Sequence, residues 1–119
     1  MGSRWDSVVV DAMDPARLGR WWAEVLEYRV VSEASDELVI GRGDGSQPEL
    51  VFSLGADAKN GKNRLHIDLR PDDQDAEVER LVDMGARRVD IGQGDEVSWV
   101  VLADPEGNEF CVLRAKDQS

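Results

Sequence analysis

The feature that most constrains this chain is an internal repeat. In each half, a polar residue stands seven positions before an aspartate suited to cap a helix: Ser7 before Asp14, and His66 before Asp73, an offset of 59 positions. A repeat of this length is typical of a chain that builds one supersecondary unit twice and buries apolar faces by combining the copies. We therefore predict two tandem modules, about 5–54 and about 63–114, within a single domain of 119 residues.

Each half is expected to contain one helix and four strands. The dipeptides Phe52-Ser53 and Phe110-Cys111, offset by 58 positions, lie in the matching last strands. Strand patterns occur at 5–10, 28–33, 37–41 and 49–54, and again at 64–70, 86–91, 98–103 and 109–114. Because one helix covers only one face of four strands, the modules would cover each other. The predicted fold class is α+β, with two tandem β-α-β-β-β modules forming curved, mixed sheets around a cleft.

Both helices have local start or stop signals. Asp14 is a favourable N-cap, and Pro15 suits the first helical position, where its missing N–H costs no hydrogen bond. Asp73 can cap the second helix in the same way, and Gly85 suits its C-terminal end. The buried stripe of the first helix is predicted to comprise Leu18, Trp21, Trp22, Val25 and Leu26.

Composition argues against two classes of partner. The chain has 14 Lys plus Arg against 25 Asp plus Glu, a formal net charge of −11. Nucleic acids and anionic membranes both attract basic surfaces, so we expect neither as a partner. Cys111 is the single cysteine, which excludes an internal disulfide and is typical of a reducing compartment. We therefore expect a cytoplasmic protein.

Five short segments occur in a characteristic order along the two halves. They are Asp14-Pro15, Trp21-Trp22, Arg64-Leu65-His66-Ile67-Asp68-Leu69, Met84-Gly85-Ala86 and Asp104-Pro105-Glu106-Gly107-Asn108. Their order resembles the vicinal oxygen chelate superfamily, which includes glyoxalase I, the bleomycin resistance proteins and the extradiol dioxygenases, and is most similar to its glyoxalase-like subgroup. The resemblance implies paired β-α-β-β-β modules, frequent homodimers and a cleft that often holds a divalent metal ion.

The resemblance also implies where metal ligands would lie. In metal-dependent members they occupy the first and last strands of each module, positions that map here to Ser7, Ser53, His66 and Cys111. His66 alone belongs to the usual His, Gln and Glu ligand set, and serine hydroxyls are poor ligands for such ions. Two usable ligands fall short of the three or four that hold a metal. We therefore expect no cofactor, and if a divalent metal does bind, His66 is its expected ligand.

Alternation places Arg64, His66 and Asp68 on one face of their strand, toward the cleft. The residues predicted to line the ligand site are Trp5, Ser7, Ser53, Arg64, His66, Asp68 and Cys111. His66 is also the candidate catalytic residue, although a hydrogen-bonded remnant of an ancestral metal site is an equal interpretation. Cys111 has a simpler interpretation as a small buried apolar residue.

Two functions from different classes remain open. The leading one is metal-independent binding of a small organic molecule by a glyoxalase and bleomycin-resistance-like protein, which acts as a homodimer. The alternative is a metal-dependent lyase, isomerase or dioxygenase that uses His66. A dimerisation module without a ligand is a third possibility, so the sequence leaves open whether the protein is an enzyme.

Overall fold

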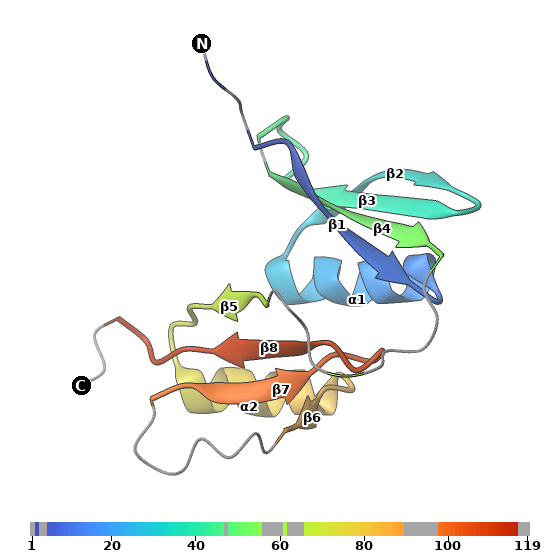
Figure 1. Ribbon diagram of the computed structural model, residues 1–119. Helices are drawn as coiled ribbons and strands as arrows, with labels where there is room; N and C mark the ends of the chain where they lie inside the picture. Colours follow the sequence, from blue (N-terminus) through green and yellow to red (C-terminus); the bar gives the residue numbers. More distant parts are fainter. Residues whose placement is uncertain are drawn as a thin grey trace. The chain divides into compact units, whose positions relative to one another are not determined.

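The computed structural model describes residues 2, 5–46, 48–55, 61, 66–89 and 98–116. The chain divides into two compact units, Met1–Ala58 and Lys59–Ser119, which we call unit 1 and unit 2. Within the described residues, each unit contains one helix and one four-stranded mixed sheet (Figure 1). This confirms the predicted α+β fold class with its repeated β-α-β-β-β order. The grouping of both modules into one domain, and a cleft shared by them, stay predictions.

Unit 1 is built from four strands and one helix (Figure 1). In chain order these are β1 (Ser7–Ala12), α1 (Pro15–Leu26), β2 (Arg29–Ala34), β3 (Glu37–Gly41) and β4 (Glu49–Leu54). The strand order in the sheet is β1-β4-β3-β2, in which β1 runs parallel to β4 and the other pairs are antiparallel. The parallel pair follows from the helical crossover, since α1 carries the chain from β1 to the far edge of the sheet and the antiparallel run β2-β3-β4 brings it back beside β1.

The predicted start of α1 is confirmed. The Asp14 side chain accepts a hydrogen bond of 3.2 Å from the backbone N–H of Arg17, and Pro15 is the first helical residue. The apolar stripe packs on one face of the sheet, where Gly19 lies directly against Leu38 and Phe52. Both of those side chains are fully buried, so this contact is the centre of the unit 1 core.

Unit 2 repeats the arrangement with shorter strands (Figure 1). Its elements are β5 (Asp68–Leu69), α2 (Gln74–Asp83), β6 (Arg87–Arg88), β7 (Val100–Ala103) and β8 (Glu109–Val112), and its strand order is β5-β8-β7-β6. Asp73 caps α2 by accepting a 3.1 Å hydrogen bond from the N–H of Ala76, as predicted. The helix stops before Gly85, whose φ of +114° suits glycine.

Strand prediction in the second half was less accurate. The predicted strand 64–70 is paired over Asp68–Leu69, and residues 62–65 lie outside the described residues. The predicted strand 98–103 begins two residues later, at Val100. Just before this start, Nε2 of Gln74 in α2 donates hydrogen bonds to the carbonyl oxygens of Ser98, at 2.7 Å, and of Val112, at 3.1 Å.

The turn between β7 and β8 is organised by a buried carboxylate. Asp104 is 1% exposed, and its Oδ1 accepts hydrogen bonds of 2.9 Å from the backbone N–H groups of Glu106 and Asn108. The side-chain amide of Asn108 donates to both of its oxygens, at 3.2 and 3.0 Å. Gly107 adopts a φ of +89° in this turn. This turn joins β7 and β8 as an antiparallel hairpin and sets the alignment of β8 against β7.

Neither α1 nor α2, the helices of the described part of the chain, has the length and apolar character needed to cross a membrane.

Candidate functional site

The two faces of the unit 2 sheet differ in chemistry. Along β8, Phe110 and Val112 point to one side and are buried in the core, whereas Glu109 and Cys111 point to the other and are partly exposed. Asp68 of β5 is the register partner of Cys111, so both lie on the same side of the sheet. We call this side the Cys111 face.

Three side chains gather on the Cys111 face. Nε2 of His66 lies 3.2 Å from Oδ1 of Asp68, and the two side chains are 55% and 49% exposed. The sulfur of Cys111 completes a group in which one ligand atom of each residue lies within 4.8 Å of the others. Neighbouring positions i and i+2 on one strand, and the register partner on the next, account for this convergence. The group combines an imidazole, a carboxylate and a thiol that a small molecule can reach.

The remaining predicted residues fall into unit 1 or outside the described residues. Ser7 pairs with Glu49 at one end of the ladder between β1 and β4, and Ser53 pairs with Asp11 near the other end. Four residues of strand separate the two serines, which is about 13 Å. Trp5 precedes β1 and is 65% exposed. Arg64 lies outside the described residues. Of the seven predicted residues, the structure therefore brings together His66, Asp68 and Cys111.

The ladders show that the two predicted equivalences between the units exclude each other. Asp11 pairs with Ser53 in unit 1, and Asp68 pairs with Cys111 in unit 2. If Ser53 is the counterpart of Cys111, then Val9 is the counterpart of His66. If Ser7 is the counterpart of His66, then Val51 is the counterpart of Cys111. Each equivalence therefore stays a prediction.

The two alternatives differ by two positions, so both assign the same residues to the same face of the sheet.

Asp11 is an acidic residue that was not among the predicted site residues. It is exposed and is the register partner of Ser53, as Asp68 is of Cys111. The segment from Val9 to Ala12 matches His66 to Leu69 when these two pairs are aligned.

The donor set of unit 2 fits a metal ion better than the sequence analysis expected. His66, Asp68 and Cys111 supply nitrogen, oxygen and sulfur, all of which bind Zn²⁺, and three protein ligands are usual in catalytic zinc sites. Asp68 is the third donor, in addition to His66 and Cys111, the two usable ligands expected from the resemblance.

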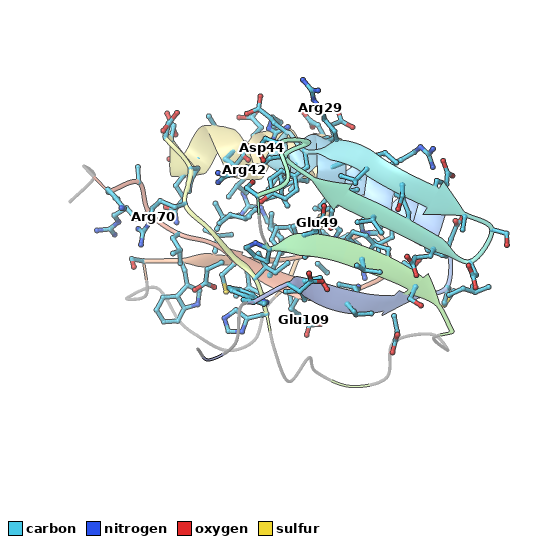
Figure 2. All side chains as sticks on the ribbon, turned by 90° about the horizontal axis from the view of Figure 1, so that it is seen from above. Arg29, Arg42, Asp44, Glu49, Arg70 and Glu109 are labelled. Carbon is cyan, nitrogen blue, oxygen red and sulfur yellow. The ribbon has the colours of Figure 1, made fainter. Side chains whose placement is uncertain are left out.

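The resolved pKa shifts among described residues belong to unit 1. Hydrogen bonds from Arg20, 2.7 and 3.1 Å long, lower the pKa of Glu33, and their ion pair raises the pKa of Arg20. In the loop between β3 and β4, hydrogen bonds from the hydroxyl and backbone N–H of Ser46 lower the pKa of Asp44, with a smaller contribution from Arg42 (Figure 2). These exposed groups stabilise local structure.

Comparison with known proteins shows which family model and which solved structures this chain resembles. The model of the glyoxalase-like domain matches residues 7–113. No curated protein matches the sequence. A glyoxalase/bleomycin resistance protein/dioxygenase family enzyme from Burkholderia phytofirmans has a similar structure, with 14% identity, a TM-score of 0.74, and coverage of 95% of this chain and 99% of its own.

Two further structures share the fold. The bleomycin resistance determinant encoded on transposon Tn5 is 17% identical, with a TM-score of 0.60 and coverage of 96% of this chain and 99% of its own. Glyoxalase I of Leishmania major is 16% identical, with a TM-score of 0.67 and coverage of 97% and 88%. Because the family model spans nearly the whole length, the chain belongs to the glyoxalase-like domain family of the vicinal oxygen chelate superfamily.

Proposed function

We propose that this protein binds a small organic molecule on the Cys111 face of unit 2, with no need for a resident metal. The observation that carries the proposal is the ion-pair geometry of His66 and Asp68, two side chains that are about half exposed and lie beside Cys111. A small-molecule site needs a few polar groups that converge on a partly apolar surface, and these residues meet that description. The bleomycin resistance determinant of similar fold is named for an organic antibiotic, which is consistent with this class of ligand.

The pair also gives the ligand a defined orientation. Asp68 accepts a hydrogen bond from Nε2 of His66 when that nitrogen carries the proton, and Nδ1 then presents a lone pair to a ligand. The second oxygen of Asp68 can accept a further hydrogen bond. A ligand with one donor toward Nδ1 and another toward the carboxylate would match both groups.

Independence from metal is supported by unit 1. The resemblance implies metal ligands on the first and last strands of both modules, and the predicted unit 1 positions are Ser7 and Ser53. A serine hydroxyl is a weak ligand, so unit 1 lacks the usual His, Gln or Glu at these positions.

The test is a ligand screen on the full chain after treatment with EDTA, read by amide NMR shifts. We expect at least one compound whose shifts map to β5 and β8 and whose affinity falls about tenfold in His66→Ala and Asp68→Asn, since each removes a hydrogen bond to a charged group. Glu79→Gln, on the exposed side of α2, is the matched control and should bind normally. The proposal would be refuted if every compound that binds has the same affinity for both site variants as for the natural protein, or if no compound binds.

The metal-dependent enzyme remains a second candidate because of one observation, the three donor atoms within 4.8 Å. His66, Asp68 and Cys111 would hold the ion, which supplies Lewis acidity when bound. Elemental analysis of protein purified without chelators, followed by zinc titration calorimetry, tests this. Stoichiometric binding that is lost in Cys111→Ser and His66→Ala would favour the second candidate, and binding weaker than millimolar would exclude it.

A homodimer and a cytoplasmic location complete the proposal. The superfamily resemblance supports the first, and the single cysteine supports the second. Sedimentation equilibrium decides the oligomeric state, because a monomer has a mass of 13.2 kDa and a dimer twice that value.

A further inference from the structure

Beyond the His66 group, the Cys111 face continues into a row that includes a cation and an exposed aromatic ring. Asp68 pairs with Cys111 and Leu69 with Val112, and the N–H of Leu113 donates a 2.8 Å hydrogen bond to the carbonyl of Leu69. The ladder therefore extends past the end of β8. One step further, Arg70 comes opposite Leu113, on the same face as Asp68.

The other neighbour of Leu113 comes from β7. Val100 pairs with Val112 in the antiparallel ladder, so the preceding residue, Trp99, comes beside Leu113. Alternation assigns Trp99 to the Cys111 face, because Val100 and Val112 belong to the opposite one. Its side chain is 38% exposed. Arg70, Leu113 and Trp99 thus form one cross-strand row, which we call the Trp99 row.

Arg70 is held in place and retains donors for a ligand. Its Nη1 donates a hydrogen bond to the carbonyl oxygen of Arg114, which orients the exposed guanidinium (Figure 2). Among the described residues no carboxylate lies within ion-pair distance of it. The nearby Asp68, two positions earlier on the same face, is instead within 3.2 Å of His66. Nε and Nη2 remain available, and arginine keeps its charge at every relevant pH.

The spacing between Arg70 and Trp99 indicates which class of ligand can contact both side chains. Neighbouring strands lie about 4.8 Å apart, so the backbones of Arg70 and Trp99 are separated by about 10 Å, with Leu113 between them. A guanidinium prefers a planar carboxylate that it can bind through two N–H groups. An exposed indole prefers another flat ring. A single aromatic ring that carries a carboxylate fits between these two groups over the apolar Leu113.

We propose that the Trp99 row recognises the aromatic carboxylate part of the ligand, with Arg70 binding the carboxylate and Trp99 stacking on the ring. This inference rests on the proposed function, because it names the ligand class of the same face. It also explains how an anion can bind a chain with a net charge of −11, since the attraction is local and the long-range field is unfavourable.

The experiment compares matched small probes by NMR titration of the full chain. The probes are phenylacetate, phenylacetamide, which lacks the charge, and cyclohexylacetate, which lacks the aromatic ring. We expect phenylacetate to bind about tenfold more tightly than the amide, from its charged hydrogen bonds, and about three- to tenfold more tightly than the cyclohexyl acid, from ring stacking.

Each variant should remove one preference and keep the other. Arg70→Gln should abolish the preference for the acid over the amide. Trp99→Leu should abolish the preference for the aromatic ring. Arg88→Gln is the matched control, because Arg88 is exposed but pairs with Leu102 on the opposite face, and it should retain both preferences. Amide spectra of each variant confirm that it is folded.

The outcomes separate this inference from the proposed function. If other organic compounds bind in a His66-dependent manner while the three probes bind equally, the inference fails and the proposed function stands. If preferences persist in Arg70→Gln and Trp99→Leu, the inference also fails. If no organic compound binds the Cys111 face, both fail together.

Discussion

Replacement of Gly19 by alanine sets two known effects against each other in the unit 1 core. In a helix interior, Gly→Ala is stabilising by about 1 kcal/mol. At Gly19, however, an added Cβ would lie far inside contact distance of Leu38 Cδ2, and 3.0 Å from Phe52 Cδ2. Leu38 and Phe52 are both 0% exposed, so neither can move into solvent. Overpacking of this kind lowers the free energy of unfolding by about 1–3 kcal/mol. Because the added Cβ would overlap strongly with Leu38, we expect the cost at Gly19 to be near the upper end of this range.

We therefore expect Gly19→Ala to destabilise the protein by about 1–2 kcal/mol after the helical gain is subtracted. In thermal unfolding this corresponds to a decrease in Tm of about 4 °C for each kcal/mol in a chain of this size. Glu24→Gly, at an exposed position of the same helix, measures the helical term without the packing term. Glu24→Gly should lower the free energy of unfolding by about 1 kcal/mol.

A double-mutant cycle identifies the contact. Leu38→Val removes Cδ2 and should cost about 1 kcal/mol by itself. In that background Gly19→Ala should be neutral or stabilising, which gives a coupling energy of about 1–3 kcal/mol. Urea unfolding of the four proteins measures each free energy. A stabilising Gly19→Ala in the natural background, or an equal cost in both backgrounds, would refute the packing argument.

Three other changes test local features of the fold. Asp104→Ala leaves the N–H groups of Glu106 and Asn108 without their buried acceptor and should cost about 2–4 kcal/mol in urea unfolding, whereas a cost near zero would contradict the role of this turn. Glu33→Gln removes the partner of Arg20. Because the folded pKa of Glu33 is lowered, the stability it contributes is present above the unfolded value of about 4.3 and is lost as pH falls through the lower folded value. The Tm difference between the natural protein and Glu33→Gln should therefore disappear in acid, and a difference independent of pH would oppose this account. Glu27→Gly relieves a φ of +56° at the end of α1 and should stabilise by about 0.5–1 kcal/mol, so a lowered Tm would count against backbone strain there.

Local signals predicted the helices and most of the unit 1 strands correctly. Asp14 and Asp73 both cap helices, because the hydrogen bond from a cap to the third following residue depends on nearby sequence alone. The strands 37–41 and 49–54 match β3 and β4, since a short apolar run in β3 and alternation in β4 are also local signals. Family and fold class followed from the order of these elements.

Register could not be predicted in the same way. The pairing of Asp68 with Cys111 joins residues 43 positions apart, and it depends on every loop between them. Counting from the caps matches Ser7 with His66, whereas the ladders match Val9 with His66 if Ser53 is the counterpart of Cys111. The face of Trp99 also requires the ladder, because it depends on the pairing of Val100 with Val112 across the hairpin. Asp68 was seen as a neighbour of His66, and its approach to Cys111 required the ladder.

The tight turn around Asp104 has a consequence for how this protein can vary. That carboxylate accepts hydrogen bonds from donors two and four positions along the chain, so the connection between β7 and β8 tolerates exchange of side chains far better than a change of length. One inserted residue would slide β8 by a single step and bring Phe110 and Val112 outward in place of Glu109 and Cys111. An apolar surface would then replace the face that carries Glu109 and Cys111, without any mutation in the strand itself.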